Sequence, residues 1–311
     1  MRPLFLLAWS ACTSVLCAQT PVTHDVVVYG DSAAAVAAAI QAKRQGLDVV
    51  LVNSTDFLGG MTCSGLSASD IFHRDAVGGV ARELYGRIGQ HYGKPYVDYF
   101  EPHVAQAAMD GMVKDAGVKV FLNEQLDRSA GGVSKEGTQL KSFRTLSGKV
   151  FVAKVFIDAT YEGDLLAKSG VVWHLGRESR DEYGESLAGR QYPKQKMEIN
   201  GFDANGLPLP FITTVRKGDD QEGEQSVMVY SFRLCLTKDP ANRVAFPAPK
   251  AYDPARFELV RRYFQKYPNA PLPWDLYPLP GEKFDANNGI GKMFSMGLVG
   301  EANGWCASDP A

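Results

Sequence analysis

The sequence lacks an excess of charge of either sign, and it has no long hydrophobic run after its first residues. Its 33 lysines and arginines balance 35 aspartates and glutamates, for a net charge of −2. Proteins neutralise nucleic-acid phosphates with a clustered basic excess, so we expect no nucleic acid among its partners. No later segment approaches the roughly 20 apolar residues that span a bilayer, and we expect no membrane span after removal of the N-terminal leader.

Low-complexity sequence and a disulfide framework are also absent. Its 31 glycines and 17 prolines make up about 15% of 311 residues, well below the share typical of low-complexity chains. The five cysteines fall to Cys63, Cys235 and Cys306 if the leader is cleaved, and three cysteines form at most one disulfide. Their spacing matches no zinc motif, so no metal site is predicted. The length allows two domains or one large one.

The first residues form a separate segment. Met1-Arg2 is followed by a mostly apolar run from Pro3 to Leu16, and then by Cys17-Ala18. A basic start, a short apolar stretch and a small residue at its end are typical of a secretory signal peptide. A buried N-terminal helix is the structural alternative. We predict cleavage near Ala18, which makes the mature protein secreted or periplasmic.

A βαβ unit follows directly. Residues 24–30 are rich in valine without polar alternation, which is typical of a strand buried on both faces. Residues 31–44 are dominated by alanine, the strongest helix former, and Gly46 ends the predicted helix. Residues 48–53 predict a second buried strand. The unit therefore has the roughly 30 residues of a minimal βαβ motif.

The turn between the first strand and the helix consists of small residues. It has the form Gly30-x-Ser32-x-x-Ala35, a relaxed version of the G-x-G-x-x-G/A fingerprint in the expected place after a strand and before a helix. Small residues there let backbone amides approach a pyrophosphate at the helix N-terminus. We therefore predict dinucleotide binding. Asn53 stands where the fingerprint has an acidic residue, and it bonds a ribose hydroxyl less strongly than a carboxylate does.

Later segments extend this predicted domain. Leu58-Gly-Gly-Met-Thr62 places paired glycines just after the second strand, where backbone can lie against a flat ligand. Residues 150–160 predict a strand pair that returns to the sheet. Between these segments, Val118–Leu122 and Leu140–Thr145 predict a small antiparallel layer inserted between sheet strands, which a simple Rossmann dehydrogenase does not have.

Together these segments resemble a known family. Residues 25–36, 58–62 and 156–165 are similar to the FAD-dependent oxidoreductase family of secreted bacterial proteins, within the glutathione-reductase-like flavoproteins. Gly176-Arg-Glu-Ser179 and Asp285-Ala-Asn-Asn288 extend the similarity to nearly the whole mature chain. The resemblance implies FAD as the cofactor and an α/β fold. We expect a Rossmann-like FAD-binding domain, with a central parallel sheet and a small antiparallel layer, plus an α+β substrate domain.

The resemblance also implies which residues bind the cofactor. They cover the pyrophosphate turn, the ribose position, the flavin side, an adenine contact and the end of the returning strand: Gly30, Ser32, Ala33, Ala34, Asn53, Gly59, Gly60, Met61, Leu126, Ala159, Thr160, Gly163 and Asp164. Members of the family normally return with a second glycine-rich segment that completes the flavin site. Gly289-Ile-Gly291 is followed by no small residue and the chain ends at Ala311, so the resemblance predicts a C-terminally truncated member.

The rear of the sequence carries fewer signals. Residues 200–210 and 240–280 are rich in Pro, Asn and Asp, which predicts turns and extended segments. One amphipathic helix is predicted at residues 254–267, with Pro at its start. Tyr277 and two tryptophans, Trp274 and Trp305, are aromatic residues of the kind that stack on sugars.

The expected function follows from these assignments. Residues 1–18 are the predicted signal peptide, 19–170 the N-terminal part of the FAD-binding domain, and 171–311 an incomplete substrate domain. The expected reaction transfers a hydride from a small-molecule or carbohydrate-like substrate to flavin N5. His73 and His103 are the candidates for a catalytic base. An NAD(P)-dependent dehydrogenase and a non-redox secreted carbohydrate-processing or carbohydrate-binding protein are the alternatives.

Overall fold

The computed structural model describes residues 22–192, 198–212, 214, 218–289, 294, 297, 300 and 302–304 of the chain. Its first part is the predicted βαβ unit, made of strand β1 (Val22–Tyr29), helix α1 (Ala33–Arg44) and strand β2 (Val49–Val52). The two strands pair in parallel. All four residues of β2 are buried, as its unbroken apolar run predicts.

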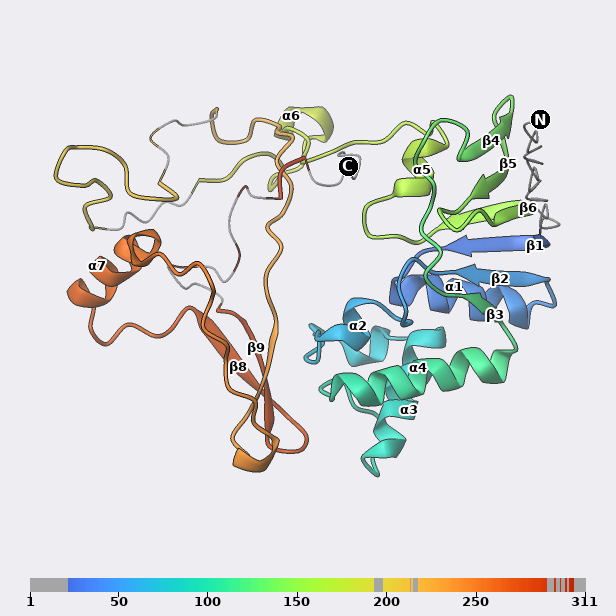
Figure 1. Cartoon of the computed structure of the whole chain (residues 1–311), viewed down its shortest axis with the longest axis horizontal. Coiled ribbons are helices and arrows are strands. Elements are labelled where there is room, and N and C mark those ends of the chain that lie inside the picture. Colours follow the sequence, from blue (N-terminus) through green and yellow to red (C-terminus); the bar gives the residue numbers. More distant parts are fainter. Residues whose placement is uncertain are drawn as a thin grey trace, which may run out of the picture.

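The main sheet has six strands in the order β3-β2-β1-β6-β5-β4 (Figure 1). The first four strands are parallel, and the last two run antiparallel to their neighbours. The remaining strands are β3 (Lys119–Phe121), β4 (Val133–Glu136), β5 (Gln139–Arg144) and β6 (Val150–Asp158). The prediction of a Rossmann-like α/β fold with a mainly parallel sheet is confirmed.

Two details differ from the expectation. The segment at Val118–Leu122 forms β3, which pairs in parallel with β2 at the far edge of the sheet and takes no part in antiparallel pairing. Residues 150–160 were expected to form a strand pair, but they contain the single strand β6. Lys154 is an exposed residue within this continuous strand and pairs with Asp25 at 2.7 Å. Because the first residues of β6 pair with both β1 and β5, the antiparallel strands extend the main sheet.

Helices cover one face of this sheet. Helices α3 (Gly79–His91) and α4 (Pro102–Ala116) lie beside α1 on that face (Figure 1). The larger hydrophobic core forms there, and its fully buried side chains include Ile40, Leu51, Ile88, Phe100 and Met112. The other face carries a smaller core beneath α5 (Asp164–Lys168), which contains Val27, Tyr29, Phe143, Phe151 and Leu165.

We refer to residues 22–170 as the front half and to the described residues after 170 as the rear half. The rear half contains α6 (Arg180–Tyr183), α7 (Glu258–Lys266) and a three-stranded antiparallel sheet of order β7-β9-β8. The strands of that sheet are β7 (Leu234–Thr237), β8 (Trp274–Leu279) and β9 (Lys283–Asn288). The helix expected at residues 254–267 is present as a 3₁₀ turn, Pro254–Phe257, followed by α7. A second 3₁₀ turn lies at Pro240–Asn242.

Several predicted features fall outside the described residues. These are the signal peptide at residues 1–18, Trp305, Cys306, and all but the first residue of Gly289-Ile-Gly291. The domain boundary near residue 170 stays a prediction. In the part of the chain that the structure describes, no helix is both long enough and apolar enough to cross a membrane.

Candidate functional site

Three loops meet at the carboxyl ends of the parallel strands β1, β2 and β6. They are residues 30–32, residues 53–60 and residues 159–163, and we name them the first, second and third loops. Ligands of open parallel sheets bind at this edge, where the helices begin. Twelve of the thirteen cofactor positions expected from the sequence lie on these loops or on the first turn of the helix that follows each; Leu126 is the exception.

The first loop fits closely against the third. Gly30 has a φ of +150°, and a Cβ added to it would lie 2.3 Å from the Ala159 carbonyl oxygen. The Ser32 hydroxyl oxygen caps α1 by accepting a hydrogen bond from the Ala35 amide at 3.3 Å, and its O–H donates to the Ala159 carbonyl oxygen at 2.6 Å. Ala33 and Ala34 begin the helix, where the first amides have no intrahelical acceptor. The first loop therefore presents free N–H groups beside the end of β6.

The second loop leads into the short helix α2 (Met61–Ser64). Gly59 and Gly60 have φ values of +85° and +53°. A Cβ on Gly60 would lie 2.2 Å from the Tyr161 hydroxyl oxygen and 2.6 Å from the Asp31 carbonyl oxygen. The Met61 amide donates to the same hydroxyl oxygen at 2.8 Å. Tyr161 thus fixes the second loop against the third; it lies in the segment 156–165 that carries the family resemblance but was not among the expected cofactor residues.

The third loop is held by hydrogen bonds within its own segment. One Asp158 carboxylate oxygen accepts from the amide and hydroxyl of Thr160 at 2.9 and 2.7 Å, and the other accepts from the Leu166 amide at 2.7 Å. The Thr160 hydroxyl oxygen accepts from the amides of Gly163 and Asp164 at 2.8 and 3.3 Å. An aspartate that bonds to backbone two residues on is a turn signal, so Asp158 was identifiable from the sequence.

Carboxylates gather beside these loops. Burial, reinforced by the charges of Asp164 and Asp31, raises the pKa of Glu162. Burial also raises the pKa of Asp164, against the opposing effect of the Arg128 guanidinium at 3.7 Å. The Asp31 carboxylate accepts a hydrogen bond from the Ser54 hydroxyl at 3.0 Å. These negative charges oppose a bound phosphate, so the loop amides and the Arg128 charge must outweigh them.

Two of the expected cofactor residues are engaged elsewhere. Asn53 is 0% exposed. Its side-chain oxygen accepts from the amide and hydroxyl of Thr55 at 2.7 and 2.9 Å, and its side-chain N–H donates to the Phe57 carbonyl oxygen at 3.2 Å. Leu126 is buried, and its amide donates to the Tyr29 hydroxyl oxygen at 2.9 Å. Asn53 shapes the second loop in this structure, and its ribose contact stays a prediction, as does the adenine contact of Leu126.

The two candidate bases lie outside the three loops. His73 is exposed and precedes the 3₁₀ turn Arg74–Ala76, which it does not cap through its side chain. His103 is exposed on the first turn of α4, where its ring centre lies 6.5 Å from that of His91. Cys63 in α2 is buried, and burial raises the pKa of its thiol to about 12. Among the described residues, no three His, Cys, Asp or Glu side chains are grouped to hold a metal ion.

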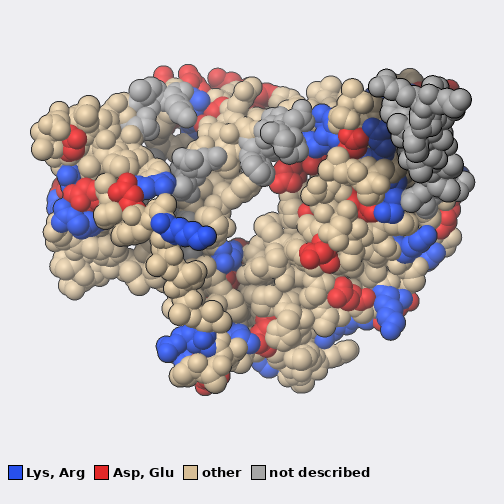
Figure 2. Space-filling view, in the orientation of Figure 1, with Lys and Arg blue, Asp and Glu red and all other residues tan. Residues whose placement is uncertain are grey.

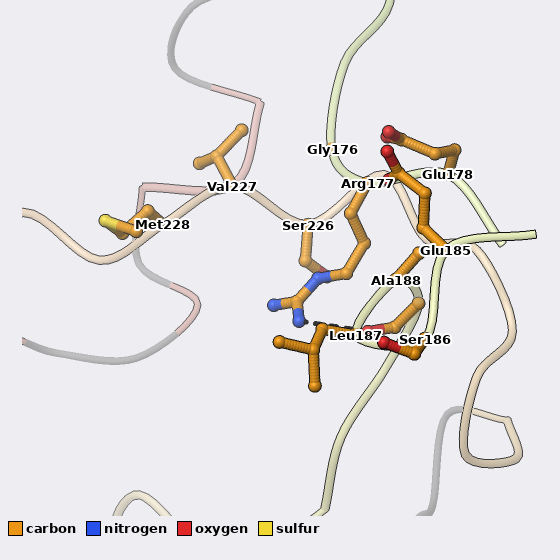
Figure 3. Close-up of a pocket in the computed structure, with 11 residues that line it drawn as sticks. Gly176, Arg177, Glu178, Glu185, Ser186, Leu187, Ala188, Ser226, Val227 and Met228 are labelled. Atoms are coloured by element: carbon orange, nitrogen blue, oxygen red, sulfur yellow. Dashed lines mark hydrogen bonds between the residues drawn. The ribbon is translucent and has the colours of Figure 1, made fainter. Parts of the chain in front are cut away.

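A separate hollow of about 910 Å³ lies in the rear half (Figure 3). Arg177 extends into it toward Leu187, and its Nε lies 3.0 Å from the Glu224 carboxylate. Its Nη1 donates to the Gly189 carbonyl oxygen at 3.3 Å. None of the expected cofactor residues lines this hollow.

The geometry of the three loops fits a dinucleotide. The α1 N-terminus supplies amides for a pyrophosphate. Gly59 and Gly60, both with positive φ, let the second loop pack closely against Cys63 and Tyr161, where a Cβ would collide. Because Gly30 has no side chain, the first loop lies in contact with the third loop at Ala159. The fold and the site together define a dinucleotide-binding α/β protein.

Comparison with protein families specifies which family of dinucleotide-binding proteins the chain belongs to. The profile of the FAD dependent oxidoreductase family matches residues 25–303. The chain belongs to this family, and FAD is its cofactor. No curated protein sequence matches the chain.

Solved flavoproteins are similar to parts of the chain. L-proline dehydrogenase from P. horikoshii is 14% identical with a TM-score of 0.39, over 51% of this chain and 59% of that one. Bacillithiol disulfide reductase from Staphylococcus aureus is 16% identical with a TM-score of 0.33, over 45% and 38%. A flavin-containing monooxygenase from Stenotrophomonas maltophilia is 19% identical with a TM-score of 0.29, over 44% and 38%. The chain thus spans less than two thirds of the length of each.

Proposed function

We propose that this protein is an exported FAD-dependent oxidoreductase that removes a hydride from a small organic substrate. The observation that carries the proposal is the meeting of three loops at the carboxyl ends of β1, β2 and β6, where close contacts leave no room for a Cβ at Gly30 or Gly60. Family membership supplies the cofactor. The basic and apolar segment that ends at Ala18 supports export.

In the proposed complex, the N-terminus of α1 binds the pyrophosphate. The Ala33 and Ala34 amides lie at the positive end of the helix dipole, which favours a negative group there. Ser32 holds these amides in place by capping the helix and bonding to the third loop. Asp31 and Ser54 are the side chains proposed to meet the adenosine ribose, since Asn53 beside them is fully buried.

The flavin ring is proposed to lie between the second and third loops. Residues 59–61 form one wall and residues 159–160 the other, with Gly163 and Asp164 behind. When bound, FAD supplies the hydride acceptor at flavin N5. The chain contributes orientation, because Tyr161 fixes the Met61 amide and Asp158 fixes Thr160 before any ligand arrives.

A binding titration tests this proposal. Flavin fluorescence is followed while purified Gln19–Ala311 is added to FAD, and saturable quenching is expected. Gly30→Val should abolish it, because the added side chain collides with the Ala159 carbonyl group. Gly78→Val is the matched control, since Gly78 has extended backbone and no heavy atom within 4 Å of an added Cβ. A parent protein that does not bind FAD, or a folded Gly30→Val variant that binds like the parent, would overturn the proposal.

Calorimetric titrations with FAD, NAD⁺ and NADP⁺ separate the two alternatives. A nicotinamide-dependent dehydrogenase would bind NAD⁺ or NADP⁺ in preference to FAD. A non-redox carbohydrate-processing or carbohydrate-binding protein would bind none of the three. Membership of an FAD-dependent family favours the flavin enzyme over both.

A further inference from the structure

The three-stranded sheet of the rear half has one polar and one apolar face. Side chains alternate between the two faces along each strand. The register places Cys235 opposite Asp285 and Asp285 opposite Tyr277, so these three side chains form a row across one face. By the same alternation, this mainly polar face also carries Thr237, Asp275, Leu279, Lys283 and Asn287, whereas the mainly apolar opposite face carries Leu234, Leu236, Trp274, Leu276, Pro278, Phe284, Ala286 and Asn288.

The polar face is turned toward the front half. Glu101, just before α4, forms an ion pair with Lys283 on this face. The rings of Tyr99 and Tyr277 lie 6.3 Å apart across the same contact. A sheet that served only to join the two halves would bury its apolar face between them. Figure 2 shows an opening between the halves. Ligand sites occur preferentially where two parts of a protein meet, and this face lies at such a contact.

Asp285 lies at the centre of this face and is 1% exposed. Its Oδ2 accepts a hydrogen bond from the Arg233 guanidinium at 2.7 Å, whereas its buried Oδ1 has no hydrogen-bond partner. Burial raises the pKa of this carboxyl, and the Arg233 charge opposes the shift. Leaving a buried carboxylate oxygen without a donor costs free energy. A hydroxyl group of a ligand would supply that donor.

A second unpartnered polar atom lies across the contact. Ser67 is 1% exposed, and its hydroxyl oxygen has no hydrogen-bond partner. The next residue, Ala68, approaches Asp285 closely enough for its backbone N–H to lower the pKa of that carboxyl. The contact therefore has an unpartnered carboxylate oxygen on Asp285 and an unpartnered hydroxyl on Ser67, one residue before Ala68.

The charges around this point balance. Arg233 and Lys283 each pair with a carboxylate, Asp285 and Glu101 respectively. A charged ligand would be repelled by the group of like charge in one of these pairs. Neutral hydroxyl groups, in contrast, can both donate to a carboxylate and accept from a guanidinium. The site suits a neutral ligand with adjacent hydroxyls.

This contact adjoins the proposed flavin wall. Gly65 ends α2, and a Cβ added there would lie 3.9 Å from the Arg233 Cβ. Helix α2 is four residues long, which corresponds to about 6 Å. Arg233 is therefore about one helical turn from Met61, where the second loop meets the proposed flavin position.

We propose that the polar face of this sheet is the substrate site, and that Asp285 Oδ1 accepts a hydrogen bond from one hydroxyl of a neutral polyhydroxylated substrate while Arg233 donates to the adjacent oxygen. The half-buried rings of Tyr99 and Tyr277 flank it. The inference rests on the proposed function only in that the bound polyol is the substrate. Binding of a polyol at Asp285 is testable without turnover.

The first test uses the parent protein. Cys235 is exposed and neighbours Asp285 in the row, so a ligand bound there shields its thiol. Alkylation of Cys235 by iodoacetamide, followed by peptide mass spectrometry, should slow in proportion to added D-glucose or myo-inositol. D-Gluconate, which adds a negative charge, should slow it less. Unchanged labelling with both neutral probes overturns the proposal, and protection by D-gluconate alone overturns the ligand class.

The second test compares variants. Asp285→Asn keeps the shape and removes the charge, and it should raise the Kd for D-glucose by about tenfold, the loss of a charge-assisted hydrogen bond. Arg233→Gln should act in the same direction, and Arg233→Lys less. Glu258→Gln breaks the carboxylate pairs with Arg261 and Arg262 on α7, away from this face, and is the matched control, with no change expected. The controls are the melting temperature and the Kd for FAD, which should match those of the parent. If they match and the Kd of Asp285→Asn for D-glucose is also unchanged, the proposal is overturned.

Flavin reduction distinguishes this inference from the proposed function. If polyol binding depends on Asp285 but no organic substrate reduces bound FAD, the site stands and the proposed function fails. If substrates reduce the flavin with the same KM in the parent and Asp285→Asn, the function stands and the site fails. If both the polyol site and the proposed function hold, the KM of the Asp285→Asn variant should rise by a larger factor than its kcat falls.

Discussion

The front and rear halves of the chain bury apolar surface to very different extents. The front half has two hydrophobic cores, one on each face of its sheet. In the described rear half, the buried apolar residues are only Leu209, Leu279 and Ala286, while Val172, Met228 and Val244 are 85–90% exposed. A domain that folds alone has its own core. The front half, which carries the cofactor loops, meets that criterion, and the rear half depends on contacts made elsewhere.

The largest expected difference between the halves is in their response to loss of an aromatic ring. Phe151 is fully buried, with its ring centre 5.1 and 5.4 Å from those of Phe121 and Phe143. Phe151→Ala should lower the free energy of unfolding by about 3–5 kcal/mol. Phe284 in β9 is only half-buried, so Phe284→Ala should cost under about 1.5 kcal/mol. Urea unfolding monitored by circular dichroism measures both, and equal losses would remove the contrast.

The second largest effect is expected at Asn53, within the front half. Asn53→Ala leaves the partly buried Thr55 amide without its acceptor, which should cost about 1–3 kcal/mol of unfolding free energy, while the Phe57 carbonyl oxygen keeps its hydrogen bond from the Thr55 hydroxyl. FAD affinity should fall with it, because the second loop loses its shape. Ser54→Ala is the neighbouring control and should weaken FAD binding without lowering stability. A stable Asn53→Ala variant would show that the loop holds its shape without this side chain.

A smaller effect is expected where the second and third loops join. Tyr161→Phe removes the acceptor of the Met61 amide and should raise the Kd for FAD by about threefold to tenfold, equivalent to one neutral hydrogen bond. Tyr183→Phe changes an exposed tyrosine of the rear half and should have no effect. Fluorescence titration gives both constants. An unchanged Kd in Tyr161→Phe would mean that the junction does not contribute to the cofactor site.

The smallest expected effect is a pH dependence of FAD binding. The pKa values of Glu162 and Asp164 are raised, so as pH rises through them each group loses a proton and adds negative charge beside the pyrophosphate. Affinity should therefore fall as pH rises through values above the ordinary carboxyl range of about 4. Glu162→Gln should tighten binding by about threefold or less at the upper end and flatten the profile. Glu136→Gln, an exposed carboxylate in β4, is the control. A parent profile that is flat or rises with pH would contradict this.

The fold was predictable where local pattern decides it. Valine runs and an alanine-rich helix identify β1, α1 and β2 because a buried βαβ unit needs little information from elsewhere. Strand β8 was not predicted, since it lies within the proline-rich segment 240–280. Pro278 is accommodated because β8 is an edge strand of its sheet, where the missing N–H leaves no bond unmade.

The site was predictable in its backbone and less so in its side chains. The turn from Gly30 to Ser32 follows from glycine and helix-start chemistry. Tyr161 acts on an amide 100 residues earlier in the chain, and the Arg233–Asp285 pair spans 52 residues. Contacts between distant segments leave no periodic signal in the sequence. The same holds for the burial of Asn53, which depends on how its loop closes on Phe57.

The pairing of β6 with β1 has a consequence during synthesis. Strand β1 ends at Tyr29, and its partner β6 begins at Val150. At roughly 5–20 residues per second, a ribosome takes about 6–24 seconds to make the chain between them. Throughout that interval the valine-rich edge of β1 stays open to any other strand that reaches it. The yield of correctly assembled protein should therefore depend on translation speed and on chaperones that cover this edge.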